Sequence, residues 1–225
     1  MQADFSRPIL AIDTSTAFLS LALGNNGADL LRHTEAGSQQ SALILPQIAE
    51  LLAEANLATA DLGAIVYAQG PGAFTGLRIG AAVAQGLAAP FDIPLIGIPC
   101  LDAVASQIPD AECVLAATDA RMGEVFYAWF DALNQRRLSD YQVGKAADIQ
   151  PPAGAVNPQG IGNAFSLPEP PPFPGMQTMP TASAYLNLAR KDRYPASGAA
   201  EAELLYVRNK IALTAREQAE RKARG

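Results

Sequence analysis

The chain of 225 residues is 49% hydrophobic and 17% charged, which excludes wholesale disorder and allows one large domain or two smaller ones. Its net charge of −6 excludes binding to nucleic acid by bulk electrostatics, because neutralising phosphates requires a basic surface. We therefore expect any contact with RNA to be local or shared with a partner.

We expect neither a membrane span nor a secretion signal. No apolar run approaches the ~18 residues of a membrane span, and the amino terminus lacks a basic segment followed by an apolar one. The two cysteines, Cys100 and Cys113, do not have the spacing of a metal site and are expected to be reduced thiols. We therefore expect a cytoplasmic protein that does not contact a membrane.

The first part of the chain mixes strands and helices, as α/β proteins do. Apolar runs predict strands at 8–12, 18–24, 29–34, 64–68 and 94–98, and helical spacing predicts helices at 41–57, 75–89 and 101–108. Asn25-Asn26-Gly27 is typical of a hairpin turn between the second and third strands. We assign residues 1–108 to a first domain.

The second part begins with the same order of elements. Strands are predicted at 114–118, 124–130 and 135–143, and the first of them ends at Asp119 as strand 8–12 ends at Asp13. Frequent prolines predict a surface loop at 151–180, and helices are predicted at 181–191, capped by Thr181, and at 210–222. We assign residues 109–205 to a smaller second domain and expect 206–225 to pack back on the first.

A glycine-rich stretch, GPGAFTGLRIG at 70–80, joins a predicted strand to a predicted helix. Its glycines allow backbone turns without a Cβ clash, and Thr75 is expected to be the N-cap of the helix. Gly76, Gly80, Ala84 and Ala88 recur at every fourth position, so one face of the helix carries almost no side chain. Such a face suits close contact with another helix or with the chain's own sheet, and spacing leaves both open.

This stretch resembles the GPGSFTGLRIG signature of the TsaB (YeaZ) family. Shorter pieces of the chain are similar to that family in the same order and spacing: Asp13-Thr14-Ser15-Thr16, Leu45-Pro46, the segment from Asp119 to Val125, and Tyr206-Val207-Arg208. The resemblance implies an α/β fold of two actin-like (ASKHA, ribonuclease H-like) lobes, the second reduced. It also implies a non-catalytic subunit that supports formation of N6-threonylcarbamoyladenosine at position 37 of tRNAs reading ANN codons.

The resemblance further implies partners. The helices at 41–57 and 75–89 are expected to bind the catalytic subunit TsaD, or a second copy of this chain when TsaD is absent, through Leu45, Ile48, Leu52, Gly76, Gly80, Val83, Ala84 and Leu87. The ATPase TsaE is expected to join the assembly, and tRNA to bind only within the complex. No cofactor is expected, except ATP at an interface with partner subunits.

The chemistry of catalysis is thinly represented. Asp13, Thr14 and Ser15, and Asp119 and Arg121, resemble degenerate phosphate loops of the actin and sugar-kinase superfamily, although the same residues also suit tight turns. A single histidine, His33, makes a zinc peptidase site improbable, and no metal site is expected. The alternative function is a stand-alone hydrolase, peptidase-like, or a small-molecule kinase of that superfamily.

The carboxyl-terminal tail is the only basic stretch. It carries Arg208, Lys210, Arg216, Arg221, Lys222 and Arg224. These cations suit a contact with tRNA phosphates or with an acidic partner, and equally a solvated helix end.

Overall fold

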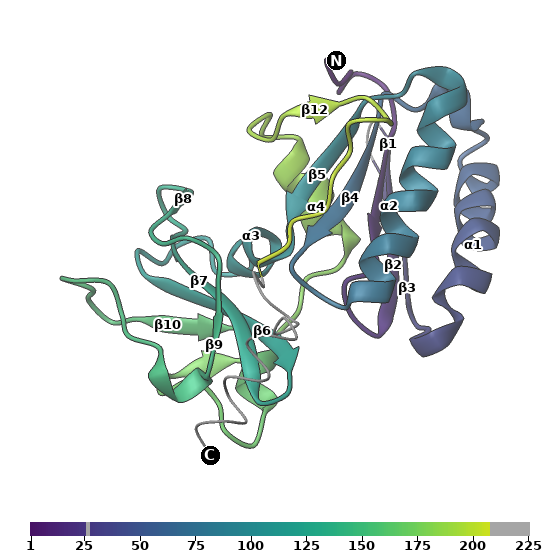
Figure 1. Cartoon of the computed structure of the whole chain (residues 1–225). Helices are drawn as coiled ribbons and strands as arrows, with labels where there is room; N and C mark the ends of the chain where they lie inside the picture. Colours follow the sequence, from purple (N-terminus) through teal and green to yellow (C-terminus); the bar gives the residue numbers. More distant parts are fainter. Residues whose placement is uncertain (26–27, 208–225) are drawn as a thin grey trace, which may run out of the picture.

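The structure is a computed structural model, and it describes residues 1–25 and 28–207. Two β-sheets lie beside each other, and the helices gather around the first (Figure 1). The tip of the predicted hairpin at residues 26–27, the predicted helix at 210–222 and the basic tail from 208 onward lie outside the described residues.

The first sheet has the strand order β12-β5-β4-β1-β2-β3. Its strands are β1 (Ile9–Asp13), β2 (Phe18–Asn25), β3 (Ala28–Glu35), β4 (Ala64–Gly70), β5 (Leu95–Pro99) and β12 (Ala196–Ser197). β1 pairs antiparallel with β2 and parallel with β4, while β2 and β3 form an antiparallel pair. β1 to β5 confirm the predicted strands to within two residues at each end, and β12 is an additional strand that was not predicted.

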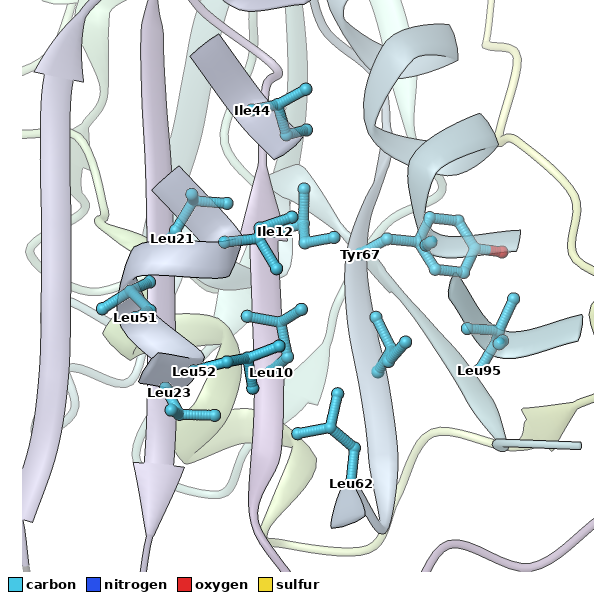
Figure 2. Packing of buried hydrophobic residues seen from close by; sticks show 14 of the residues in the cluster. Leu10, Ile12, Leu21, Leu23, Ile44, Leu51, Leu52, Leu62, Tyr67 and Leu95 are labelled. Carbon is cyan, nitrogen blue, oxygen red and sulfur yellow. The ribbon is translucent and has the colours of Figure 1, made fainter. Parts of the chain in front are cut away.

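Helices cover both faces of this sheet. They are α1 (Gln40–Glu54), α2 (Phe74–Ala88), α3 (Cys100–Ala105) and α4 (Ala182–Ala189). Short 3-10 turns η1 (Gly37–Gln39), η2 (Thr59–Asp61) and η3 (Ala89–Phe91) lie in the same part of the chain, whereas η4 (Ala146–Asp148) and η5 (Asn163–Ser166) pack on the second sheet. Alternating residues of β1 explain the two layers. Leu10 and Ile12 face α1 and α2 (Figure 2), whereas Ile9 and Ala11 face α4.

The second sheet repeats part of the first. It is formed by β6 (Val114–Arg121), β7 (Glu124–Asp131), β8 (Arg136–Arg137), β9 (Gln142–Gly144), β10 (Gln159–Ile161) and β11 (Gly175–Met176), in the order β11-β10-β6-β7-β8, with β9 also paired to β7. β6 pairs antiparallel with β7 and parallel with β10, as β1 does with β2 and β4. No α-helix forms between 114 and 181, so the second lobe is the reduced one.

The structure corrects one prediction about the second part and refines another. The predicted strand at 135–143 is divided into β8 and β9, because the Ser139 hydroxyl accepts the backbone N–H of Trp129 at 3.0 Å in place of a backbone carbonyl. The proline-rich segment 151–180 is mostly irregular, as predicted, and contributes only the short elements β10, η5 and β11.

The predicted boundary at 205 is also wrong, because the chain returns to the first lobe at α4. The N–H of Ala182 donates to the Ser20 hydroxyl of β2 at 2.8 Å, and Tyr185 and Leu186 are buried in the core behind β1. Residues 196–207 then follow the first sheet, where the N–H of Leu205 donates to the carbonyl of Gln69 at 2.9 Å. The apolar face of α4 fits the uncovered side of the first sheet, and this decides its lobe.

Candidate functional site

The turn after β1 satisfies its own polar groups. Asp13 is 5% exposed, and its Oδ1 accepts the backbone N–H of Ser15 at 2.8 Å. Burial raises the pKa of the Asp13 carboxyl, and the hydrogen bonds from Ser15 oppose that rise. Asp13 therefore acts as the anchor of a tight turn, one of the two interpretations that the sequence allowed.

The glycine-rich stretch packs directly on this turn. The Thr14 hydroxyl donates to the carbonyl of Gly76 at 2.7 Å, and the N–H of Ala73 donates to the carbonyl of Ser15 at 2.8 Å. A Cβ added to Gly76 would lie 2.0 Å from the Thr14 carbonyl oxygen. Glycine is required at this position because two backbone segments meet there.

The start of α2 differs from the prediction. The helix begins at Phe74 with Ala73 as N-cap, so Thr75 lies inside its first turn and the prediction of Thr75 as the N-cap is wrong. The contact between Ala73 and Ser15 sets the start of the helix. Thr181, the predicted cap of α4, occupies the N-cap position but makes no side-chain capping bond.

A buried thiol and a buried phenol lie near Asp13. Burial, followed by the Asp13 charge, raises the pKa of the Cys100 thiol to about 12. The same two effects raise the pKa of Tyr185, whose hydroxyl is buried without a hydrogen-bond partner among the described residues. A thiol with so high a pKa is a poor nucleophile at neutral pH, because the thiolate is the reactive form.

The turn after β6 is built differently. Asp119 Oδ1 accepts the N–H of Arg121 at 2.7 Å, and the N–H of Asp119 donates to Asn163 Oδ1 at 2.9 Å. The Arg121 guanidinium lies 3.3 Å from Asp119 Oδ2 and is largely exposed. The residues at the tip, Arg121 and Met122, have positive φ angles. This turn is the exposed end of a hairpin, whereas the turn after β1 is enclosed.

Most of the predicted partner-binding residues are buried in the chain's own first lobe. Five of the eight are buried there: Ile48, Leu52, Gly76, Gly80 and Ala84. A Cβ on Gly80 would lie 2.4 Å from the Thr14 hydroxyl, so the small-residue face of α2 packs on the turn after β1 and on the sheet. Gly80 and Ala84 therefore pack on the chain's own sheet, one of the two arrangements that their spacing left open, and a partner contact at or next to them stays a prediction.

The sequence and the fold of this chain match those of known proteins. A family model described as "TsaD: tRNA N6-adenosine threonylcarbamoyltransferase" matches residues 34–219. The solved structure described as "YeaZ from Pseudomonas aeruginosa" has a TM-score of 0.81 and 30% identity, covering 89% of this chain and 99% of that chain. The chain belongs to this family, and within it to the TsaB (YeaZ) proteins.

Sequence relatives agree with that assignment. The tRNA threonylcarbamoyladenosine biosynthesis protein TsaB of Escherichia coli (strain K12) is 42% identical over 123 residues, 53% of either chain. The protein of the same name from Haemophilus influenzae is 40% identical over 136 residues, 59% of this chain and 57% of that one. These alignments span little more than half the length of the two relatives. The α/β fold of two actin-like lobes, the second reduced, is confirmed.

The TsaB signature also supplies exposed residues that the sequence analysis missed. Phe74 is 53% exposed, the Arg78 guanidinium lies 3.8 Å from the centre of its ring, and the Tyr206 ring lies 6.4 Å away. We call Phe74, Arg78 and Tyr206 the Phe74 cluster. The sequence signal that could have found this cluster is an aromatic residue, Phe74, within a glycine-rich stretch. Leu45 of α1 is 52% exposed, whereas Val83 and Leu87 are partly buried against the core.

Two further findings concern metals and membranes. Within residues 1–25 and 28–207, no group of three or more His, Cys, Asp or Glu side chains is placed to hold a metal ion. His33 stacks on the Phe18 ring, with centroids 4.6 Å apart, on the outermost strand of the first sheet. None of the described helices combines the length and apolar character needed to cross a membrane.

Proposed function

We propose that the chain is a non-catalytic scaffold subunit that binds and activates TsaD and so supports formation of N6-threonylcarbamoyladenosine at position 37 of tRNAs reading ANN codons. The names of the Escherichia coli and Haemophilus influenzae relatives support a role in this biosynthesis. The family model supports an ancestry shared with the transferase itself.

The enclosed turn after β1 carries the non-catalytic part of the proposal. Asp13 is bonded to Ser15, the Thr14 hydroxyl to Gly76, and the Ser15 carbonyl to Ala73. A phosphate loop needs backbone N–H groups and hydroxyls that face a ligand. Here the Ser15 N–H is used within the turn and the Thr14 hydroxyl is used by α2 of the same chain, and this arrangement supports a structural role for the turn.

The partner-binding part of the proposal rests on exposed residues of α1 and α2. α1 and α2 begin at the same edge of the first sheet, and a Cβ on Gly76 would lie 2.9 Å from Oε1 of Gln40. Leu45 and the Phe74 cluster therefore present apolar and aromatic groups together with one guanidinium, the residue types enriched in protein interfaces. Val83 and Leu87 of α2 are partly buried, and we place them at the edge of the proposed interface.

Activation follows if this surface binds the active conformer of TsaD more tightly than the inactive one. In the absence of TsaD, the same surface pairs with a second copy of the chain. TsaE joins the assembly, the ATP that the assembly uses binds at an interface between subunits, and tRNA is modified only within the complex. The proposal places this chemistry in the cytoplasm, with no resident cofactor and no membrane contact.

The chain offers matched variants for the test. Leu45→Glu and Phe74→Glu place a charge on the proposed interface, while Leu133→Glu and Phe91→Glu place the same charge at positions of equal exposure, 50% and 51%. Burying an unpaired carboxylate at an interface costs several kcal/mol. Titration calorimetry with TsaD is expected to show at least about tenfold weaker binding for the first pair and changes within about twofold for the second.

Activity separates this proposal from its alternative. Addition of the chain is expected to raise tRNA modification by TsaD, and the Leu45 and Phe74 variants are expected to lose that effect. The purified chain alone is expected to turn over neither ATP nor peptides. Turnover by the chain alone, together with unchanged TsaD binding by both variants, would favour a stand-alone hydrolase or a small-molecule kinase.

A further inference from the structure

A basic pocket lies where the two lobes meet, away from the turn after β1 and from the Phe74 cluster. Its walls are α3 and the turn that follows it, the β7–β8 hairpin, and the carboxyl end of α4 with the residues beyond. Arg193 links the lobes here, since its Nη1 donates to the carbonyl of Gln135 at 2.9 Å. The cavity has a volume of about 120 Å³.

Cations are concentrated around this pocket. Of the 16 lysines and arginines in an acidic chain, four line it: Arg136, Arg137, Lys191 and Arg193. The ammonium group of Lys191 makes no hydrogen bond or ion pair with any residue in the described part of the chain. Such crowding of like charges raises the free energy of the folded chain unless an anion is close.

The two acidic residues that line the pocket neutralise the cations only in part. Asp102 is turned to two tyrosines, accepting from Tyr141 at 2.5 Å and from Tyr194 at 2.9 Å, and burial raises its pKa. Asp131 accepts three hydrogen bonds from the backbone and side-chain amides of Asn134, and its Oδ2 lies 3.4 Å from Arg136. Outside the lining, Asp140 Oδ1 lies 3.8 Å from the Arg137 guanidinium, which also stacks on the Tyr141 ring. The four cations therefore face three carboxylates, and burial makes one of these, Asp102, easier to protonate than usual.

The volume of the pocket and its apolar lining limit the kind of ligand that it can hold. Phe130, Ala105 and Leu188 provide apolar surface beside the cations. The volume is several times the ~30 Å³ of a water molecule but below the ~300 Å³ of a site that encloses a whole drug-sized ligand. We infer that this pocket binds the phosphate group of a larger molecule, a nucleotide or an RNA strand, whose remainder lies outside the cavity.

This inference does not depend on the proposed function, and it can be tested with the full chain. The probes are inorganic phosphate, ADP and an unmodified tRNA transcript, titrated at about 50 mM salt. The pocket variant is Arg136→Gln with Lys191→Gln, both exposed side chains, and single Lys191→Gln is the fallback if the double variant unfolds. The control is Arg32→Gln with Lys145→Gln, which removes the same charge away from the pocket.

We expect the pocket variant to bind at least one phosphate probe about tenfold or more weakly than the unmodified chain, and the control variant to change binding by less than about threefold. If tRNA is the ligand, the slope of log K against log salt becomes shallower by about 1–2 in the pocket variant. Binding of ADP but not tRNA identifies a nucleotide, and the converse identifies RNA. No binding of any probe at millimolar concentration, or equal losses in the two variants, overturns the inference.

Discussion

The contact between α2 and the turn after β1 makes a sharp prediction for Gly76→Ala. A methyl group at this position would lie 2.0 Å from the carbonyl oxygen of Thr14 and 2.9 Å from Oε1 of Gln40. The first of these neighbours is backbone that is held by β1 and cannot turn away. The turn and the helix therefore have to separate, which loosens the bond from the Thr14 hydroxyl to the Gly76 carbonyl.

The size of the effect follows from two opposing contributions. Overpacking of a well-packed core costs about 1–3 kcal/mol, and the severity of this contact places it at the upper end. Alanine gains about 1 kcal/mol over glycine in a helix. The free energy of unfolding is therefore expected to fall by about 1–2 kcal/mol, which lowers Tm by about 2–8 °C in a chain of this size.

Gly86→Ala on the same helix is the matched control, because a Cβ there has no neighbour within 4 Å. It is expected to raise the free energy of unfolding by about 1 kcal/mol. Urea denaturation followed by circular dichroism measures both variants. If Gly76→Ala were as stable as the unmodified chain, the helix would not be packed on the turn, and its small-residue face would again be available to a partner.

Three further predictions concern buried polar groups. Because burial raises the pKa of Asp13, its contribution to stability is present below the unfolded pKa of about 3.9 and is lost as pH rises through the native pKa. Asp13→Asn should therefore flatten the pH dependence of urea denaturation above about pH 4, and an unchanged profile would contradict this. Tyr185→Phe removes an unpartnered hydroxyl and should leave Tm unchanged or higher. Tyr194→Phe removes a hydrogen bond to Asp102 and should lower the free energy of unfolding by about 1–3 kcal/mol. The reverse ranking of the two variants would contradict these hydrogen-bond assignments. The Cys100 thiol should resist iodoacetamide at pH 8 until the chain is unfolded, as judged by mass spectrometry, and rapid native labelling would refute its burial.

The local sequence was sufficient to predict most of the strands and helices of the first lobe. The apolar run at 8–12 became β1, and the spacing of Ile44, Ile48 and Leu51 predicted the buried face of α1. These patterns depend on near neighbours in the chain, which is why they can be interpreted without a structure. The β8–β9 break was missed because it depends on the Ser139 hydroxyl meeting a strand ten residues away.

For the candidate site, the sequence by itself determined which residues gather near the turns: Asp13 and the glycine-rich stretch lie where β1 and β4 end, and Asp119 lies close to the end of β6. Only the tertiary structure decided what the small-residue face of α2 contacts. Small residues at every fourth position indicate a close neighbour, but they do not specify which one. The tertiary structure also decided that α4 covers the first sheet and that Arg136 and Lys191 line one pocket. These contacts join residues far apart in the chain, and only the path of the folded backbone brings them together.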